Sequence, residues 1–253
     1  MENLKQVLAA RTSFLAYVRL MEPDLQLANL HYRVIQQYQA LADGYCLSSQ
    51  VHVPPQSGTT TLAVLFMAFL GGYTRPDADG NQPSFAYVGS RLYDRIFEKT
   101  RKYMCSELHQ LVFPRSVEDA SRSSRLSIKS GPVTLHFFSY AQSPTGISLD
   151  GIVFDAGYDE REAPSITQNF IASWLPRVSP TTFLHLQGCR YNSADWYGKA
   201  LREPRDWSIL VVPAVVNGKS YWPKHWDTES LSRLRSHLEP HQWAAQYMQQ
   251  PIA

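Results

Sequence analysis

Residues 51–62 read VHVPPQSGTTTL, and this stretch decides how the rest of the chain is interpreted. It begins with residues typical of a β-strand, passes through two prolines, turns at Ser57-Gly58 and enters the apolar helical run LAVLFMAFL. A strand, a tight glycine-containing turn and a helix form the layout of a phosphate-binding loop. Such a loop carries a lysine directly after its glycine, whereas this sequence has Thr59 at that place.

A phosphate loop binds its anion through consecutive backbone N–H groups, a lysine that neutralises phosphate charge, and a hydroxyl that ligates Mg²⁺. No Lys or Arg occurs from Val34 to Thr74, so a shifted lysine is excluded. Losing one charge-assisted hydrogen bond weakens phosphate binding by about one to two orders of magnitude. The alternative interpretation is an ordinary turn between a strand and a helix. If the loop does bind nucleotide, its candidate residues are Gln56, Ser57, Gly58, Thr59, Thr60 and Thr61.

A second candidate is the acidic residue that ends the apolar run in LDGIVFDAGYDEREA, which is Asp155. A carboxylate at the end of a buried strand is typical of the Mg²⁺ site in ATPases with a phosphate loop. A hydrolytic site of this kind has a second acid directly afterwards, and here that residue is Ala156. Asp159, Glu160 and Glu162 read as solvated charges. The alternative is an aspartate that ends a strand in a turn.

A third candidate is Arg190 in FLHLQGCRYNSADWYG, where a predicted buried strand leads into a polar turn. The alternative is a surface arginine after a strand. Other chemistries find little support, because the eight histidines show no zinc-binding spacing and no nucleophile elbow is present.

The bulk composition favours a folded protein of the cytoplasm. The chain has 253 residues, of which 44% are hydrophobic and 18% charged, so a sizeable core is expected. A net charge of +2 permits nucleic acid binding without indicating it. Cys46, Cys105 and Cys189 are widely separated and predicted to be reduced. The longest apolar run, Leu62–Leu70, is too short to cross a bilayer, so we expect a soluble protein of the cytoplasm without membrane contact.

Hydrophobic periodicity predicts alternating helices and short strands. The stretch Val117–Ser130 is polar and without periodicity, and Gly71–Pro83 reads as a surface connection. The predicted helices cover Met1–Leu20, Leu27–Ala42, Thr60–Leu70, Leu92–Met104, Thr167–Leu175, Ser193–Leu201 and Thr228–Met248. The predicted strands cover Gln50–Val53, Phe85–Val88, Val133–Phe138, Gly151–Phe154, Thr182–Leu186 and Ile209–Val212.

Short apolar strands that alternate with helices indicate an α/β fold, with a mostly parallel sheet flanked by helices on both faces. No linker is evident, so we expect one domain. Its expected parts are an N-terminal helical segment at 1–45, a P-loop-like core at 46–215 and a C-terminal helical segment at 216–253.

Taken in order, several segments resemble one family, the ATPase domain of the phage terminase large subunit. The resemblance covers nearly the whole chain and implies a P-loop NTPase-like fold. It rests on eight segments: AARTSFLAY, LHYRVIQQYQALADGY, VPPQSGTTTL, FAYVGSRLYDRIFEKTRKYM, LVFP, SPTGISLDGIVFDAGYDEREAPS, LQGCRYNSADWYG and the closing WAAQYMQQP.

The departures from the family pattern fall on residues needed for hydrolysis. Thr59 replaces the phosphate-binding lysine, Ala156 replaces the catalytic acid, and Cys189 stands where a threonine is expected. Asp155 and Arg190 are retained, which implies catalytic roles for both. The resemblance further implies that Thr60 and Asp155 would hold Mg²⁺ indirectly, with ATP as the nucleotide if nucleotide binding survives.

Two functions follow from the resemblance. The first is a DNA-packaging ATPase domain with weak or lost hydrolysis, in which Arg11, Arg91, Arg95 or a neighbouring subunit replaces the missing cation. A ring of subunits could also present Arg190 or the stretch Arg115–Arg125 in trans. The second is a non-hydrolysing structural or binding protein of phage assembly.

The resemblance also implies partners. They are double-stranded DNA, the portal protein, the small terminase subunit or a separate nuclease chain, and further copies in a homo-oligomeric ring, since the family's nuclease domain is absent from this sequence. The best basic cluster for DNA contact consists of Lys99, Arg101 and Lys102 on one predicted helix, with Arg122 and Arg125. The alternative for this cluster is a solvated helix face.

Overall fold

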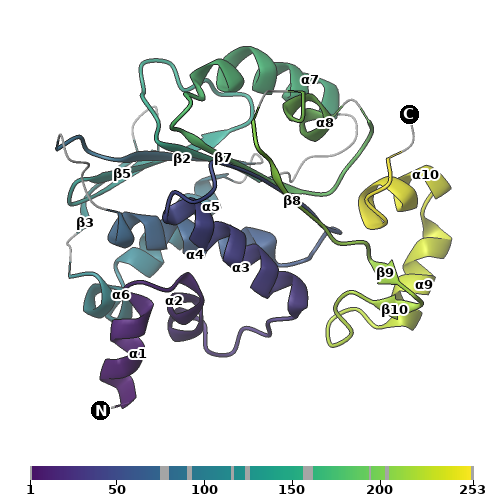
Figure 1. Cartoon of the computed structure of the whole chain (residues 1–253), viewed down its shortest axis with the longest axis horizontal. Coiled ribbons are helices and arrows are strands. Elements are labelled where there is room, and N and C mark those ends of the chain that lie inside the picture. Colours follow the sequence, from purple (N-terminus) through teal and green to yellow (C-terminus); the bar gives the residue numbers. More distant parts are fainter. Residues whose placement is uncertain are drawn as a thin grey trace.

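The computed structural model describes residues 2–74, 80–89, 93–114, 117–122, 126–155, 162–193, 195–202 and 205–251, with only the backbone of residues 2, 3 and 117–122. Within these residues, helices cover both faces of one large sheet, and a small hairpin belongs to the C-terminal part of the chain (Figure 1). The strands are β1 (Ser48–His52), β2 (Ser84–Gly89), β3 (Val117–Arg122), β4 (Leu126–Ser130), β5 (Val133–Ser139), β6 (Gly151–Asp155), β7 (Phe183–Gly188), β8 (Ser208–Val211), β9 (Val215–Val216) and β10 (Lys219–Ser220).

The large sheet has eight strands in the order β3-β4-β5-β2-β6-β7-β1-β8. All neighbours from β5 to β8 pair in parallel, which confirms the predicted mostly parallel sheet. Every residue of β1, β6 and β7 is buried, as a strand covered on both faces requires. Because parallel strands end at the same edge, the segments that follow β1, β6 and β7 meet there.

Hydrophobic periodicity predicts no strand in Val117–Ser130, whereas the structure has two antiparallel strands there, β3 and β4, at the edge of the sheet. An antiparallel edge strand needs only one apolar face, so its polar residues hide the strand signal. In β4 the fully buried Ile128 provides that face, while the adjacent Lys129 is exposed.

Helices α1 to α6 lie on one face of the sheet, and α7 and α8 lie on the other (Figure 1). Among the described residues, no helix is both long and apolar enough to cross a membrane. The helices are α1 (Glu2–Ala10), α2 (Phe14–Met21), α3 (Asn29–Ala42), α4 (Thr59–Tyr73), α5 (Tyr93–Met104), α6 (Glu107–Val112), α7 (Ala163–Asn169), α8 (Trp196–Ala200), α9 (Thr228–His237) and α10 (Pro240–Gln242), with π-helical turns at Phe170–Trp174 and Trp243–Tyr247 and a 3₁₀ turn at Leu175–Arg177.

Two predicted terminal helices are interrupted. The segment Met1–Leu20 forms α1 and α2, since the Ser13 hydroxyl accepts a hydrogen bond from the Ala16 N–H and starts a new helix. The predicted helix Thr228–Met248 is interrupted after α9. Pro240 has no backbone N–H group to donate to the preceding turn, so it cannot lie in the interior of a helix.

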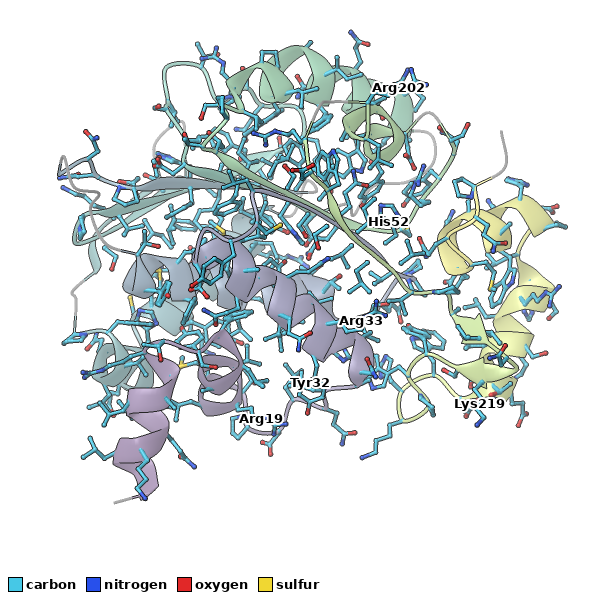
Figure 2. All side chains as sticks on the ribbon, viewed as in Figure 1. Arg19, Tyr32, Arg33, His52, Arg202 and Lys219 are labelled. Carbon is cyan, nitrogen blue, oxygen red and sulfur yellow. The ribbon has the colours of Figure 1, made fainter. Side chains whose placement is uncertain are left out.

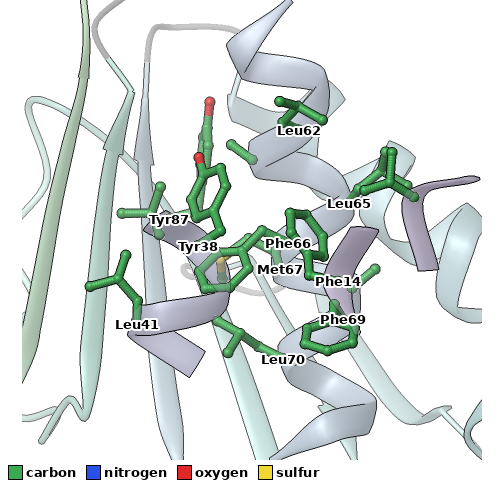
Figure 3. Close-up of a cluster of buried hydrophobic side chains, with 14 of the residues drawn as sticks. Phe14, Tyr38, Leu41, Leu62, Leu65, Phe66, Met67, Phe69, Leu70 and Tyr87 are labelled. Atoms are coloured by element: carbon green, nitrogen blue, oxygen red, sulfur yellow. The ribbon is translucent and has the colours of Figure 1, made fainter. Parts of the chain in front are cut away.

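Helix α4 is longer than predicted and anchors the loop that precedes it. It continues through Gly71 and Gly72, where a Cβ atom at Gly72 would lie 2.2 Å from the Phe113 ring. The helix is buried almost all round, and Tyr38 stacks on Phe66 at 4.2 Å between ring centroids (Figure 3). Each such side chain contributes about 1.5–3 kcal/mol on burial, which fixes α4 under the sheet.

Candidate nucleotide-binding site

The strand–loop–helix layout predicted for residues 51–62 is confirmed. β1 ends at His52, the Val53 N–H donates to the Gly188 carbonyl at 3.0 Å, and α4 begins at Thr59. Gly58 precedes the helix with φ +74°, a left-handed conformation that favours glycine. Because Gly58 has no side chain to accept from the first-turn N–H groups, the start of α4 has the form of an anion cradle.

His31, which the sequence interpretation missed, holds the loop from the side of α3. Its Nδ1 accepts from the Ala28 N–H at 2.8 Å, so Nε2 carries the proton and donates to the Ser57 carbonyl at 3.0 Å. Burial lowers the pKa of His31 below its usual value, which favours this neutral form. The ring meets Trp222 edge to face at 4.5 Å, so the C-terminal part of the chain covers the loop.

The hydroxyl residues of the loop face different surroundings. Ser57 donates to the Pro54 carbonyl and lies 3.4 Å from the Tyr221 hydroxyl, so its side chain serves the loop itself. Thr59, at the position of the missing lysine, is buried with 6% of its surface exposed. Thr60 is exposed, and its hydroxyl lies close enough to the Asp155 carboxyl to lower the pKa of that group. Thr61 is half-buried.

Asp155 ends β6 and lies beside the start of α4. The Tyr87 hydroxyl donates to its Oδ2 at 2.8 Å, and the Tyr140 hydroxyl donates to its backbone carbonyl. Burial raises the pKa of the Asp155 carboxyl, whereas the polar side chains of Thr60, Tyr87 and Gln187 oppose that rise. The structure therefore brings together Thr60 and Asp155, the two residues predicted to hold Mg²⁺.

No group of three or more His, Cys, Asp and Glu side chains suited to a metal ion occurs in the part of the chain that the structure describes. Mg²⁺ in nucleotide sites uses one or two carboxylates together with phosphates and water. A single carboxylate next to a threonine hydroxyl is a suitable set of protein ligands for such a site.

Polar side chains behind the edge form a buried network that the sequence interpretation also missed. The Tyr38 hydroxyl donates to Gln187 Oε1 at 2.6 Å, and His185 Nδ1 lies 3.2 Å from the Ser49 hydroxyl. Gln187 also favours the ionised form of Asp155, although its Nε2 makes no well-aligned hydrogen bond to the described residues. Burial lowers the pKa of His185 to about 4. Alternating polar residues inside apolar strands were the available signal.

Arg190 follows β7 at the same edge and is held within its own segment. Its Nε donates to Asp195 Oδ2 at 2.8 Å, and the two side chains are 11% and 0% exposed. Asp195 also accepts from the N–H groups of Tyr191 and Gly198, and Gln249 Oε1 accepts from the Arg190 N–H at 3.2 Å.

The surroundings of this segment shift the pKa values of two neighbouring side chains, His52 and Cys189. Burial and the nearby Arg190 charge lower the pKa of His52, above the sheet in Figure 2, to about 3. Burial raises the pKa of the Cys189 thiol to about 11, so the residue at the expected threonine position is an inert thiol.

Several predicted residues cannot be placed. Ala156, Arg91 and Arg125 lie outside the described residues, as do Asp159, Glu160 and Arg115, and the side chain of Arg122 is not described. Of the proposed substitute cations, Arg11 donates to the Leu111 carbonyl at 3.4 Å, away from the loop. Arg95 lies on the exposed side of α5.

Two cavities lie near the loop, one of them connected to it only through Trp222. One, of about 700 Å³, is lined by Arg19, Tyr32 and Trp222 among others. Arg19 donates to the Tyr32 hydroxyl at 2.6 Å, and Figure 2 shows the two residues together below α3. Trp222 connects this cavity to the loop, since its ring comes within 4.0 Å of a Cβ atom built at Gly58. The other, of about 350 Å³, reaches Thr60 and Thr61.

Neither the protein-family models nor the curated proteins contain a match to this sequence. Solved structures do match. A mutant large terminase ATPase domain of Thermus phage P74-26 has a TM-score of 0.61 at 14% identity, over 93% of this chain and 97% of that one. The HK97 bacteriophage large terminase has a TM-score of 0.57 at 12% identity, over 90% of this chain and 51% of that one.

The large terminase of a thermophilic bacteriophage, in complex with ADP, gives a TM-score of 0.51 at 12% identity. The match covers 89% of this chain and 53% of that protein, so this chain spans about half the length of the HK97 and ADP-bound terminases. These likenesses establish the architecture around the loop: the chain has the P-loop NTPase-like fold of the phage large terminase ATPase domains.

Proposed function

We propose that this chain is a terminase-like ATPase domain of a phage DNA-packaging motor, which binds ATP through its phosphate loop and hydrolyses it weakly or not at all. The contact between Thr60 and Asp155 carries the proposal. It joins a hydroxyl at a helix start to a carboxylate at a strand end, the pair that holds Mg²⁺ in P-loop ATPases. The fold shared with large terminase ATPase domains supports the proposal.

In this proposal the backbone N–H groups of Gln56–Thr60 bind the phosphates, with Thr60 and Asp155 holding Mg²⁺. Thr60 and Asp155 would hold the ion there, and it would supply positive charge that offsets the negative charge of the phosphates. The 700 Å³ cavity would receive the base, since Tyr32 and Trp222 offer aromatic faces in its wall and Trp222 adjoins the loop. The ADP bound to the large terminase of the thermophilic bacteriophage is consistent with a nucleotide ligand for this fold.

Weak or absent hydrolysis follows from three features. Thr59 offers no positive charge to the phosphates, and Ala156 offers no carboxylate to activate water. Arg190 is engaged by Asp195, so its charge is already neutralised within the chain. Each loss removes a different part of the chemistry, and together they leave a site better suited to binding than to turnover.

The proposed partners are those of a packaging motor. They are double-stranded DNA, the portal protein, the small terminase subunit or a separate nuclease chain, and further copies of this chain in a ring. The fold likeness supports this class of partner, and the solved HK97 and ADP-bound proteins are themselves large terminases.

Calorimetric titration of ATP and Mg²⁺ tests the proposal on the natural protein and on a Thr59→Lys, Ala156→Asp double variant. We expect measurable binding by the natural protein and binding about 10- to 100-fold tighter by the variant, because a charge-assisted hydrogen bond is restored. A phosphate-release assay should then detect hydrolysis mainly in the variant. Absence of binding by both proteins would contradict a nucleotide function.

The second candidate is a non-hydrolysing binding or structural protein of phage assembly, which the internal Arg190–Asp195 pair favours. An Asp155→Asn variant separates the two candidates. If the protein is a nucleotide-dependent motor, the variant should lose both Mg²⁺-dependent ATP binding and binding to its motor partner. A structural protein should lose neither portal nor DNA binding, as measured by co-sedimentation with each partner.

A further inference from the structure

The 350 Å³ cavity at the start of α4 contains two lysines. Its wall includes Thr60 and Thr61 from the first turn of α4, Lys99 and Lys102 from α5, and Glu22 at the end of α2. The cavity therefore connects the hydroxyl that contacts Asp155 with two positive charges that come from 38 or more residues further along the chain.

The two helices that line this cavity, α4 and α5, begin at the same edge of the sheet. Both α4 and α5 follow a parallel strand, β1 and β2 respectively, so both begin at the carboxyl edge of the sheet. Side chains of a helix lean towards its N-terminus, and residues three apart share a face. Lys99 and Lys102 are three residues apart, so they share the face of α5 that lines the cavity with Thr60 and Thr61.

The charges of the two lysines are available. Both are exposed, and neither forms an ion pair with a described residue. Arg101, on the same helix but outside the cavity wall, is instead paired with Glu98 at 3.2 Å. The acidic member of the wall, Glu22, accepts a hydrogen bond from the Tyr103 hydroxyl. The net charge of the cavity wall is positive.

We propose that Lys99 and Lys102 supply in cis the positive charge that the phosphate loop lacks at Thr59, and bind the phosphate oxygens of the nucleotide. This inference rests on the proposed nucleotide function and identifies its phosphate-binding side chains. It places the cation on the neighbouring helix, where Mg²⁺ at Thr60 and the lysines would share the phosphate charge between them.

The test is calorimetric titration with ATP–Mg²⁺ and separately with pyrophosphate, on the natural protein and on two charge-matched variants. The Lys99→Gln, Lys102→Gln variant should bind both ligands about 10- to 100-fold more weakly, since at least one charge-assisted contact is lost. The control, Arg101→Gln, removes a charge from the same helix outside the cavity and should change affinity less than about twofold. Circular dichroism establishes that the variants are folded.

A second variant is expected to tighten binding, and a gain in affinity cannot result from damage to the protein. Glu22→Gln removes the negative charge from the wall and keeps an acceptor for Tyr103, so it should tighten pyrophosphate binding about two- to fivefold. Unchanged affinity in both the lysine and the Glu22 variants would overturn the inference.

The pattern of results separates the inference from the function on which it rests. ATP binding that does not depend on the lysines would overturn the inference and keep the nucleotide function. Lysine-dependent pyrophosphate binding without ATP binding would keep the anion site and reject the nucleotide function. Binding of neither ligand would reject both, and a lysine variant that loses only duplex DNA binding would assign these lysines to DNA instead.

Discussion

The loop after β1 and the segment after β7 end neighbouring strands at one edge of the sheet, yet they use their polar groups differently. In the loop, Gly58 leaves the first N–H groups of α4 without a side-chain cap, and Thr60 is exposed. In the segment, the Asp195 carboxylate accepts from Arg190 and from two backbone N–H groups. An open helix start keeps donors for a ligand, whereas a closed ion pair uses them for stability.

The largest expected effect comes from breaking the ion pair between Arg190 and Asp195. Asp195→Ala removes the carboxylate that neutralises the largely buried Arg190 charge, so we expect a loss of about 3–5 kcal/mol in the free energy of unfolding. Urea denaturation measures it. The exposed Arg101–Glu98 pair is the control, because Glu98→Ala should cost at most about 1 kcal/mol. Equal effects at the two pairs would show that Asp195 does not serve as the partner of a buried charge.

Acidification should destabilise the protein through the histidines behind the edge. Burial lowers the pKa of His185 to about 4, so the unfolded chain binds its proton more readily than the folded one. Stability is therefore complete above pH of about 6.5 and falls as the pH drops towards 4, by about 3 kcal/mol for this group. Denaturation at a series of pH values measures the slope, and His185→Gln should make it shallower.

Substitutions in the loop after β1 should lower the free energy of unfolding less than Asp195→Ala does, but they should weaken ligand binding. Gly58→Ala places a Cβ atom on a residue with φ +74°, 3.3 Å from His31 Nε2, so we expect a loss of about 1–2 kcal/mol. ATP–Mg²⁺ affinity, measured by calorimetry, should fall together with stability. Unchanged ATP–Mg²⁺ affinity in the Gly58→Ala variant would show that the loop does not bind the nucleotide.

The smallest expected effect concerns the contact between the C-terminal part of the chain and the closed segment. Gln249→Ala removes the acceptor of the Arg190 N–H, which should cost about 0.5–1.5 kcal/mol. Nucleotide affinity should stay the same, since the change lies on the closed side. Thermal unfolding and calorimetry on the same variant check both expectations, and a large fall in affinity would show that the two sides are coupled.

Local features of the candidate site could be predicted from the sequence. The loop is visible because strand residues, a glycine and an apolar helical run are adjacent along the chain, and Asp155 is visible because it ends an apolar strand. Contacts from distant positions were not predictable. Tyr87 reaches Asp155 from 68 residues away through sheet pairing, and Lys99 reaches the cavity at Thr60 through the packing of α5 on α4.

The same distinction explains the parts of the fold that were missed. Gly71 and Gly72 read as a helix stop, since their role depends on the remote Phe113 ring that packs against them. The His31 position belongs to the buried face of α3, so its pattern resembles an ordinary core residue. Only the pairing of its two ring nitrogens with Ala28 and Ser57 reveals that it shapes the loop.

The contact of Trp222 with the loop gives this protein an internal optical reporter. Its indole lies edge-on to His31 and within 4.0 Å of a Cβ atom built at Gly58, whereas Trp174 and Trp196 are fully buried elsewhere in the core. Any anion that reorders the loop would change the polarity around this indole while the emission of the buried pair stays constant. Because the chain has six tryptophans, the difference in intrinsic fluorescence between the natural protein and a Trp222→Phe variant can follow events at the loop, on the timescale of mixing.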